Sequence, residues 1–254
     1  MTDIPSLYTG TAGGNTIGTA PCSNIYGLKI FDDSGGSGYS SYIINALNVV
    51  KERHVSNPNA KSVVSMSLAG SCGTSCASNP VIQLISSMYD LGILFSVAAG
   101  NNYNANACLY FPAASPQAVT VAASHENDNF ASYSNTGPCV DIIGPGTYVN
   151  SACSTCSDEA SYVIHSGTSM ATPHVAGTLA QLLQKKNVSF TTAPNIVKAA
   201  LLCDAVKNKI QGIIPQSFGT AVNLLLQVPK NDSNFGDCLP TAEPTVKGIR
   251  IRRK

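Results

Sequence analysis

The most constraining feature of this sequence is the alternation of short apolar runs with longer segments of helical periodicity. Residues 93–99 are nearly all apolar, as is typical of a parallel strand covered on both faces. Alternation of this kind predicts βαβ units and an α/β fold with a mainly parallel sheet. The expected strands are 24–30, 61–67, 93–99, 118–123 and 140–143, and the expected helices are 39–53, 80–89, 168–185 and 194–206. In such a sheet the functional residues gather at the carboxyl ends of the strands.

Charge and length exclude several classes of protein. Only 11% of the 254 residues are charged and the net charge is +1, while 44% are hydrophobic. A disordered chain would combine low hydrophobicity with high net charge, and a nucleic-acid-binding protein would carry a basic surface. No apolar run reaches the ~18 residues that span a bilayer, and residues 1–10 have neither the basic nor the apolar region of a signal peptide. The length fits one large domain, which we expect at 1–228. Residues 231–245 are polar and turn-rich and five of the last eight residues are basic, so we expect a polar linker and a disordered basic tail at 229–254.

The nine cysteines favour an oxidising compartment. Two pairs lie close in sequence, Cys72 with Cys76 and Cys153 with Cys156. The second pair could form half of a zinc site, but a zinc site needs a second pair at ligand spacing. Structural disulfides or buried thiols are the preferred interpretation, and a zinc-bound module remains the alternative.

The segment 166–177 carries the clearest chemical signal. It reads Ser-Gly-Thr-Ser-Met-Ala-Thr-Pro-His-Val-Ala-Gly, so that a glycine turn delivers Ser169 to the first turn of a helix. There a backbone N–H and the positive end of the helix dipole can stabilise an oxyanion. A serine at a helix start is more often only a cap. The whole run, however, resembles the nucleophile motif of the subtilisin-like serine peptidases, and it differs from the G-x-S-x-G elbow of α/β-hydrolases.

Other segments resemble the same family, and its proteinase K-like branch in particular. Residues 96–102 (Ser-Val-Ala-Ala-Gly-Asn-Asn) resemble the strand end that presents the oxyanion-hole asparagine, which implies that role for Asn101. Residues 67–70 resemble the Ser-Leu-Gly-Gly edge of the substrate groove, with alanine in place of the first glycine, and residues 37–39 resemble the opposite edge. The implied substrate-binding residues are Ser37, Gly38, Tyr39, Ser67, Leu68, Ala69, Gly70, Ala99 and Gly100.

The resemblance extends from about Tyr8 to Val228 and implies a three-layer α/β/α fold. It further implies an extracellular, monomeric serine endopeptidase that holds extended peptides as an added strand. No cofactor is required, but family members often bind structural calcium. By resemblance, the carbonyls of Pro116 and Ala118 and the carboxylate of Asp141 form such a site.

Two members of the catalytic triad have no counterpart. The family's catalytic histidine would fall near Ile4 and its aspartate before Met1, so the triad Asp and His are not present. The four histidines, His54, His125, His165 and His174, are not expected to replace them, because a general base must first have the right geometry. We therefore expect the chain alone to be inactive.

The same absence affects the fold, which is expected to lack the family's N-terminal strand and helix and to leave neighbouring strand edges unpaired. Three explanations stay open: a truncated reading of a longer gene, complementation by another fragment, and a pseudopeptidase that binds extended peptides. The missing signal and propeptide favour truncation.

Overall fold

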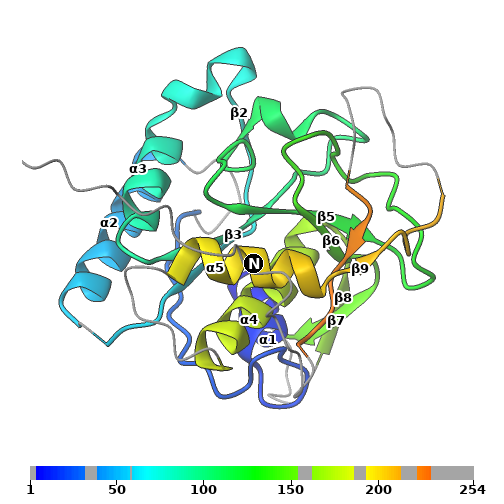
Figure 1. The fold of residues 1–254 in the computed structure, drawn as a ribbon, viewed down its shortest axis with the longest axis horizontal. Helices are drawn as coiled ribbons and strands as arrows, with labels where there is room; N and C mark the ends of the chain where they lie inside the picture. The colour runs from blue at the N-terminus through cyan, green and yellow to red at the C-terminus, as the bar shows by residue number, and fades with distance from the viewer. Residues whose placement is uncertain are drawn as a thin grey trace, which may run out of the picture.

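A six-stranded sheet forms the centre of the computed structural model, which describes residues 4–31, 39–57, 59–153, 162–185, 193–212 and 222–229. Its strands in spatial order are β1 (Val63–Met66), β3 (Leu94–Ala98), β5 (Val119–Ser124), β6 (Ile142–Pro145), β10 (Leu224–Leu225) and β9 (Val206–Lys207). Each pair from β1 to β10 is parallel, and only β9 runs antiparallel to its neighbour β10. The predicted mainly parallel sheet is confirmed (Figure 1).

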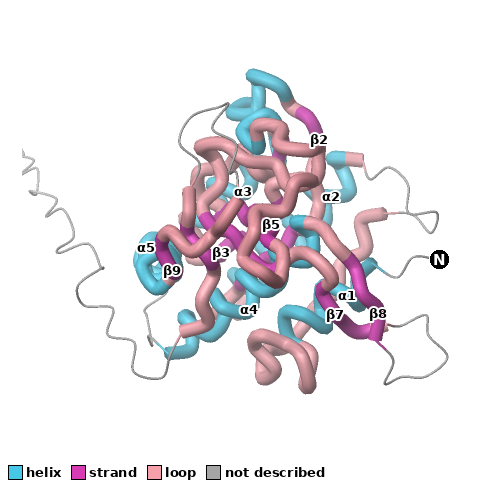
Figure 2. The backbone as a smooth tube through the Cα atoms, turned by 90° about the vertical axis from the view of Figure 1, so that its right-hand side faces the viewer, coloured by secondary structure: helices cyan, strands magenta, loops and turns pink. Residues whose placement is uncertain are grey.

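Helices cover both faces of this sheet. The described helices are α1 (Ile4–Gly13), α2 (Ser40–Val55), α3 (Pro80–Tyr89), α4 (Thr168–Lys185) and α5 (Ala193–Asp204), with short 3-10 turns η1 (Gly73–Ser78) and η2 (Ala107–Leu109). Of these, α2 to α5 pack on the sheet, whereas α1 lies beside α4 and β7. Leu94 of β3 packs with side chains of α4 and α5, whereas Phe95 and Val97 pack with α2 and α3. The alternation of side chains along a strand thus places the two pairs of helices on opposite faces. The result is the expected three-layer α/β/α fold (Figures 1 and 2).

Local signals in the sequence account for the best-predicted elements. The side chain of Asn79 accepts a hydrogen bond of 2.9 Å from the Val81 N–H, and Pro80 opens α3. This is the predicted combination of an N-cap and a first-turn proline. All five residues of β3 are buried, as expected for a strand with a neighbour on each side and a helix on each face. The predicted helix over 168–185 also has the observed bounds.

The predicted strand over 24–30 is wrong. These residues have no regular secondary structure, and Tyr26 leaves 66% of its surface exposed. A β-strand is stabilised by ladder bonds to a neighbour, and among the described residues no strand pairs with this segment. Among the described residues β1 pairs with β3 alone, so β1 forms an edge of the sheet. An apolar strand with an open edge is the arrangement that the missing triad motifs predicted.

Two small antiparallel sheets flank the core. One pairs β2 (Gly70–Ser71) with β4 (Tyr110–Phe111), and the other pairs β7 (Val149–Ala152) with β8 (Tyr162–His165). The second ribbon lies beside α1 (Figure 2), where the Thr11 hydroxyl donates to Ser151 Oγ at 2.9 Å. It thereby helps to hold α1 in place.

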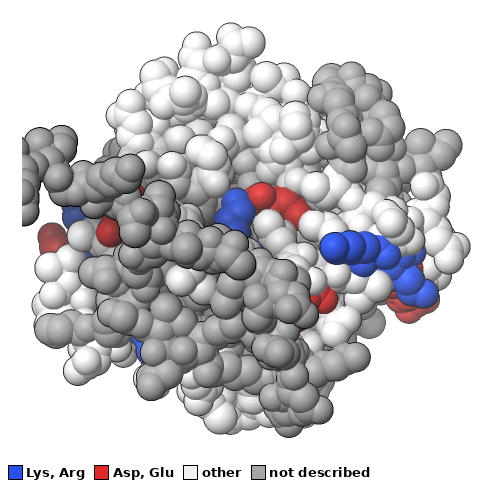
Figure 3. All heavy atoms as spheres, in the orientation of Figure 1, with Lys and Arg blue, Asp and Glu red and all other residues white. Residues whose placement is uncertain are grey.

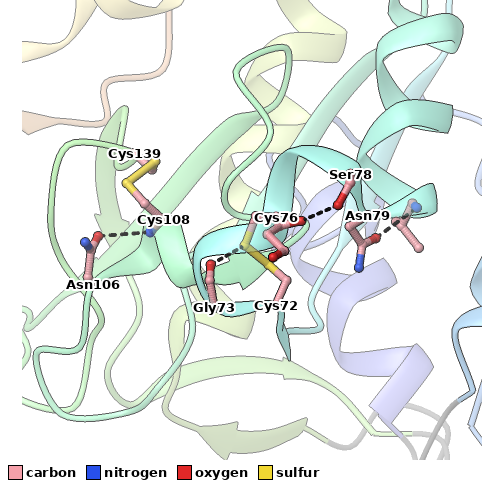
Figure 4. Close-up of a disulfide and its surroundings, with 10 residues drawn as sticks. Cys72, Gly73, Cys76, Ser78, Asn79, Asn106, Cys108 and Cys139 are labelled. Carbon is pink, nitrogen blue, oxygen red and sulfur yellow. Dashed lines mark hydrogen bonds between the residues drawn. A yellow bond between two sulfur atoms is a disulfide. The ribbon is translucent and has the colours of Figure 1, made fainter.

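Disulfides replace the zinc alternative for the described cysteines other than Cys22, which is a free, exposed thiol. Cys72 bonds to Cys76 and Cys108 to Cys139 (Figure 4), and Cys153 is also in a disulfide. A cysteine in a disulfide has no thiolate to offer a metal. Cys156 lies outside the described residues, and the part of the chain that is described contains no cluster of three or more metal-ligating side chains.

Charged side chains are sparse on the face shown in Figure 3, in keeping with the composition. None of the described helices is both long and apolar enough to cross a membrane. The proposed tail falls almost entirely outside the described residues, so the boundary between 228 and 229 stays a prediction.

Candidate active site

The amino end of α4 presents Ser169, which is half-buried in the first turn. Gly167, the residue before α4, donates its N–H to the carbonyl of Gly146 at 2.8 Å and accepts from the Met170 N–H at 3.0 Å. These bonds fix the turn before the helix to the end of β6. The first N–H groups of a helix have no helical carbonyl to bond, so the Ser169 N–H is available as a donor.

Asn101 is held against the same turn by Thr168, a residue that the sequence motif did not single out. Asn101 Oδ1 accepts from the Thr168 N–H at 2.9 Å and from Thr168 Oγ1 at 3.0 Å. Thr168 Oγ1 in turn accepts from the Gly100 N–H at 3.2 Å. Because both bonds engage the oxygen of the Asn101 amide, its Nδ2 is left as a donor on the other side.

Asn101 Nδ2 and the Ser169 N–H border one small space. A Cβ built on Gly167 would lie 3.2 Å from Asn101 Nδ2 and 3.6 Å from the Ser169 nitrogen. This space is open because residue 167 has no side chain. Two N–H donors close to one point beside a serine are groups of the kind that stabilise the oxyanion of acyl transfer.

The proposed substrate edge adjoins this space. Ser67, at the end of β1, donates its hydroxyl to the Ser169 carbonyl at 2.8 Å. Ala99 and Gly100 follow β3, the parallel neighbour of β1, so both strand ends reach the same side of the sheet. Gly100 has φ +102° and lies against the Asn135 side chain, which donates to the Ala99 carbonyl at 2.9 Å.

The remaining predicted groove residues are less closely connected to Ser169. Leu68 and Ala69 link β1 to β2, in which Gly70 pairs with Phe111. Tyr39 precedes α2 and is exposed, with its ring edge-on to Tyr42. Ser37 and Gly38 lie outside the described residues.

The partner of the Ser169 side chain is Tyr8, on α1. Burial raises the pKa of Tyr8 above its usual 10.0, and the hydrogen bond with Ser169 lowers it only partly. A phenol with a raised pKa stays protonated at neutral pH, so it is a poor acceptor for the serine proton. Nothing in the sequence indicated this contact, because it depends on how α1 packs beside α4.

All four histidines lie within the described residues, and none is hydrogen-bonded to Ser169. His54 Nδ1 contacts Ser62 Oγ at 2.9 Å and its Nε2 contacts the Leu91 carbonyl at 3.0 Å. The ring of His174 bonds the Met170 carbonyl at 2.9 Å, and burial lowers its pKa below 6.5. His165 is exposed on β8, and His125 packs edge-on to Tyr133.

The three residues expected to hold calcium do converge, but around a lysine. Lys198 Nζ, from α5, lies 3.2 Å from the Pro116 carbonyl, 2.6 Å from the Ala118 carbonyl and 3.0 Å from Asp141 Oδ1. The sequence indicated the oxygens but not the lysine, because β6, β7, β8 and α4 separate Lys198 from Asp141 along the chain. Since an ammonium group already occupies the centre of these oxygens, they do not fit a metal ion.

A large cavity opens along the free edge of β1. Its volume is about 1220 Å³, and every residue of β1 lines it. The irregular segment 23–31 and residues of α1, α2 and α4 also line it. Peptide groups at an unpaired edge can accept another strand.

Comparisons with known proteins agree with this fold and geometry. The model of the subtilase family matches residues 6–231. An extracellular serine proteinase of Thermus sp. (strain Rt41A) is 37% identical over 220 residues, 87% of this chain and 49% of the relative. Alkaline serine exoprotease A of Vibrio alginolyticus is 35% identical over 240 residues, 94% of this chain and 41% of the relative. A solved cold-adapted subtilisin-like serine proteinase matches with a TM-score of 0.73 and 37% identity, covering 88% of this chain and 74% of that one.

The chain therefore belongs to the subtilase family of serine proteases. It spans about half or less of the length of these curated relatives, 49% and 41%.

Proposed function

We propose that Ser169 is the nucleophile, and that Asn101 Nδ2 and the Ser169 N–H are the oxyanion donors, of a subtilisin-type endopeptidase site. The observation that carries this proposal is the single space bordered by both donors beside Gly167. The substrate is a peptide in extended conformation, whose backbone pairs with the segment from Ser67 to Gly70 and with residues 99–100.

Acyl transfer at this site requires three chemical events. Ser169 Oγ attacks the peptide carbonyl carbon, the carbonyl oxygen becomes an oxyanion between the two donors, and the serine proton passes through a base to the departing amine. In this proposal Ser169 and the two donors supply the first two, whereas the hydrogen-bond partner of Ser169 is the protonated phenol of Tyr8. We propose that this chain alone does not turn over peptides, because loss of the histidine base slows a subtilisin on the order of 10⁶-fold.

An activated ester, p-nitrophenyl acetate, tests the half-site without requiring a strong base. The chain should show a slow esterase rate that Ser169→Ala abolishes and that added imidazole, a diffusible base, increases. Asn101→Ala should lower the Ser169-dependent rate by about 10²–10³-fold, the usual effect of an oxyanion donor. Ser87→Ala, which removes an exposed helix hydroxyl, is the matched control and should change nothing. An equal rate in Ser169→Ala and the unmodified chain would overturn the assignment.

The natural setting follows from the relatives. One of them is named an extracellular proteinase, and this chain has disulfides, which persist in oxidising compartments. We therefore propose that the protein acts outside the cell as a monomer and needs no cofactor for catalysis.

The free edge of β1 favours a second candidate, a non-catalytic protein that binds extended peptides. The cavity beside that edge offers unpaired backbone groups and apolar walls, which suit an added strand. Fluorescence anisotropy with a labelled strand-forming peptide separates the two functions. Saturable peptide binding without a Ser169-dependent esterase rate supports the second candidate, and a Ser169-dependent esterase rate supports the first.

A further inference from the structure

We infer that Lys198 is a built-in cation that takes the place of calcium between α5 and the amino ends of β5 and β6. The inference concerns the stability of the fold and is independent of the activity proposed for Ser169. It rests on the contacts of one ammonium group.

The donors and acceptors at this place match in number. A lysine ammonium carries three N–H donors and no acceptor. Three oxygens surround it: the carbonyl of Pro116 at 3.2 Å, the carbonyl of Ala118 at 2.6 Å and Asp141 Oδ1 at 3.0 Å. Every donor therefore has a partner supplied by the protein.

The surroundings make the contact specific. The side chains of Lys198 and Asp141 are only 17% and 24% exposed, so the pair is better shielded than a surface ion pair. Asp141 Oδ2 is engaged separately, by the Thr120 N–H at 2.8 Å. The carboxylate is thus fixed in place with one oxygen directed at the lysine.

A calcium ion at the same place would need a different set of ligands. Calcium takes six to eight oxygens at about 2.3–2.6 Å, and it would have to displace an ammonium group that is covalently attached to α5. The charge balance also suits the lysine, because a single carboxylate faces a single positive charge. We conclude that this site holds the lysine with or without calcium in solution.

The position of Lys198 gives the contact a structural role. Pro116 and Ala118 precede β5, Asp141 precedes β6, and Lys198 lies in the middle of α5. One side chain therefore clamps a helix of the outer layer to two neighbouring strands of the sheet. A second link from α5, the 2.6 Å hydrogen bond from the Tyr89 hydroxyl to Asn195 Oδ1, reaches the end of α3.

Thermal unfolding with and without calcium tests the inference. The unmodified chain should have the same Tm in 5 mM EGTA and in 5 mM calcium chloride. Lys198→Ala should lower the Tm in EGTA by roughly 3–10 °C, and calcium should restore part of that loss because the oxygens and Asp141 are then free. Lys209→Ala is the matched control: it removes a more exposed lysine, 3.4 Å from Asp128, and should give a small loss that calcium does not restore.

Two results would overturn the inference. One is a rise in the Tm of the unmodified chain with calcium that disappears in Asp141→Asn. The other is a Tm of Lys198→Ala equal to that of the unmodified chain in EGTA. If Lys198→Ala does not fold, the calcium titration of the unmodified chain still decides, since it needs no variant, and Lys198→Arg, which keeps the charge, should remain insensitive to calcium.

Discussion

The hydroxyl of Thr168 connects the two halves of the proposed oxyanion site, so its removal should cost stability. Thr168 is fully buried, and its Oγ1 both donates to Asn101 Oδ1 and accepts from the Gly100 N–H. Thr168→Val keeps the shape of the side chain and removes both bonds. We expect the fold to be retained and the free energy of unfolding to fall.

The magnitude follows from the burial of each partner. The Gly100 N–H is buried and loses its acceptor, which costs about 1–3 kcal/mol. Asn101 is exposed and keeps the bond from the Thr168 N–H, so its loss is about 0.5–1.5 kcal/mol. The added methyl group returns up to about 0.8 kcal/mol. The net loss is therefore about 1–4.5 kcal/mol, or roughly 2–18 °C in Tm for a chain of this size.

Urea denaturation of Thr168→Val, Asn101→Ala and the double variant measures this loss and its origin. Because the two side chains share a bond, the double variant should lose less than the sum of the single losses, with a coupling of about 0.5–1.5 kcal/mol. Ser56→Ala, which removes an exposed hydroxyl bonded to its own helix, should change stability by less than about 0.5 kcal/mol. Losses that add within about 0.3 kcal/mol would show that the two residues do not cooperate and would refute this reasoning.

Further predictions concern the turn before Ser169, the pH dependence and the disulfides. In Gly146→Ala, the new Cβ would lie 2.6 Å from Ala123 Cβ and 2.9 Å from the Gly167 carbonyl oxygen. We therefore expect urea denaturation to show a free energy of unfolding lower by about 1–3 kcal/mol, together with a lower esterase rate. An unchanged esterase rate would count against the role of this turn. Burial lowers the pKa of His174 in the folded state below its unfolded 6.5. The unfolded chain therefore takes up this proton first as the pH falls, so the free energy of unfolding decreases below pH 6.5 and is unaffected by His174 above it. His174→Gln should therefore flatten the decline in stability between pH 7 and pH 5, and an unchanged slope would contradict the assignment. Removing the Cys108–Cys139 bond, which closes 31 residues, should lower the free energy of unfolding by roughly 4 kcal/mol. Removing Cys72–Cys76, which closes 4 residues, should lower it by roughly 2 kcal/mol. Double serine variants of each pair, compared by Tm, test this order, and the opposite order would contradict the loop-closure explanation.

Local signals made part of this fold predictable. Asn79 and Pro80 marked the start of α3, and the apolar run before Gly100 marked a strand buried on both faces. The motif around Ser169 indicated both a helix start and a chemistry, because a glycine turn places the Ser169 N–H in the first turn of a helix, where it has no helical carbonyl to bond. The convergence of Pro116, Ala118 and Asp141 followed from the family resemblance.

Contacts between distant segments were not predictable in this way. Lys198 reaches Asp141 only because α5 packs on β5 and β6, and Tyr8 reaches Ser169 only because α1 lies beside α4. The segment 24–30 has the composition of a strand but lacks a neighbour with which to form a ladder. Composition records the tendency of a segment, whereas pairing depends on what the rest of the fold places beside it.

The central claim is that the described residues hold a nucleophile and oxyanion donors without a base for Ser169. Intact-mass spectrometry after exposure to a fluorophosphonate measures this directly, because the probe forms a bond to an activated serine and adds a defined mass. We predict that the unmodified chain, like Ser169→Ala, stays essentially unlabelled under conditions that label a complete subtilisin fully. Stoichiometric labelling that maps to Ser169 and is absent in Ser169→Ala would show that a base is present and would contradict the account.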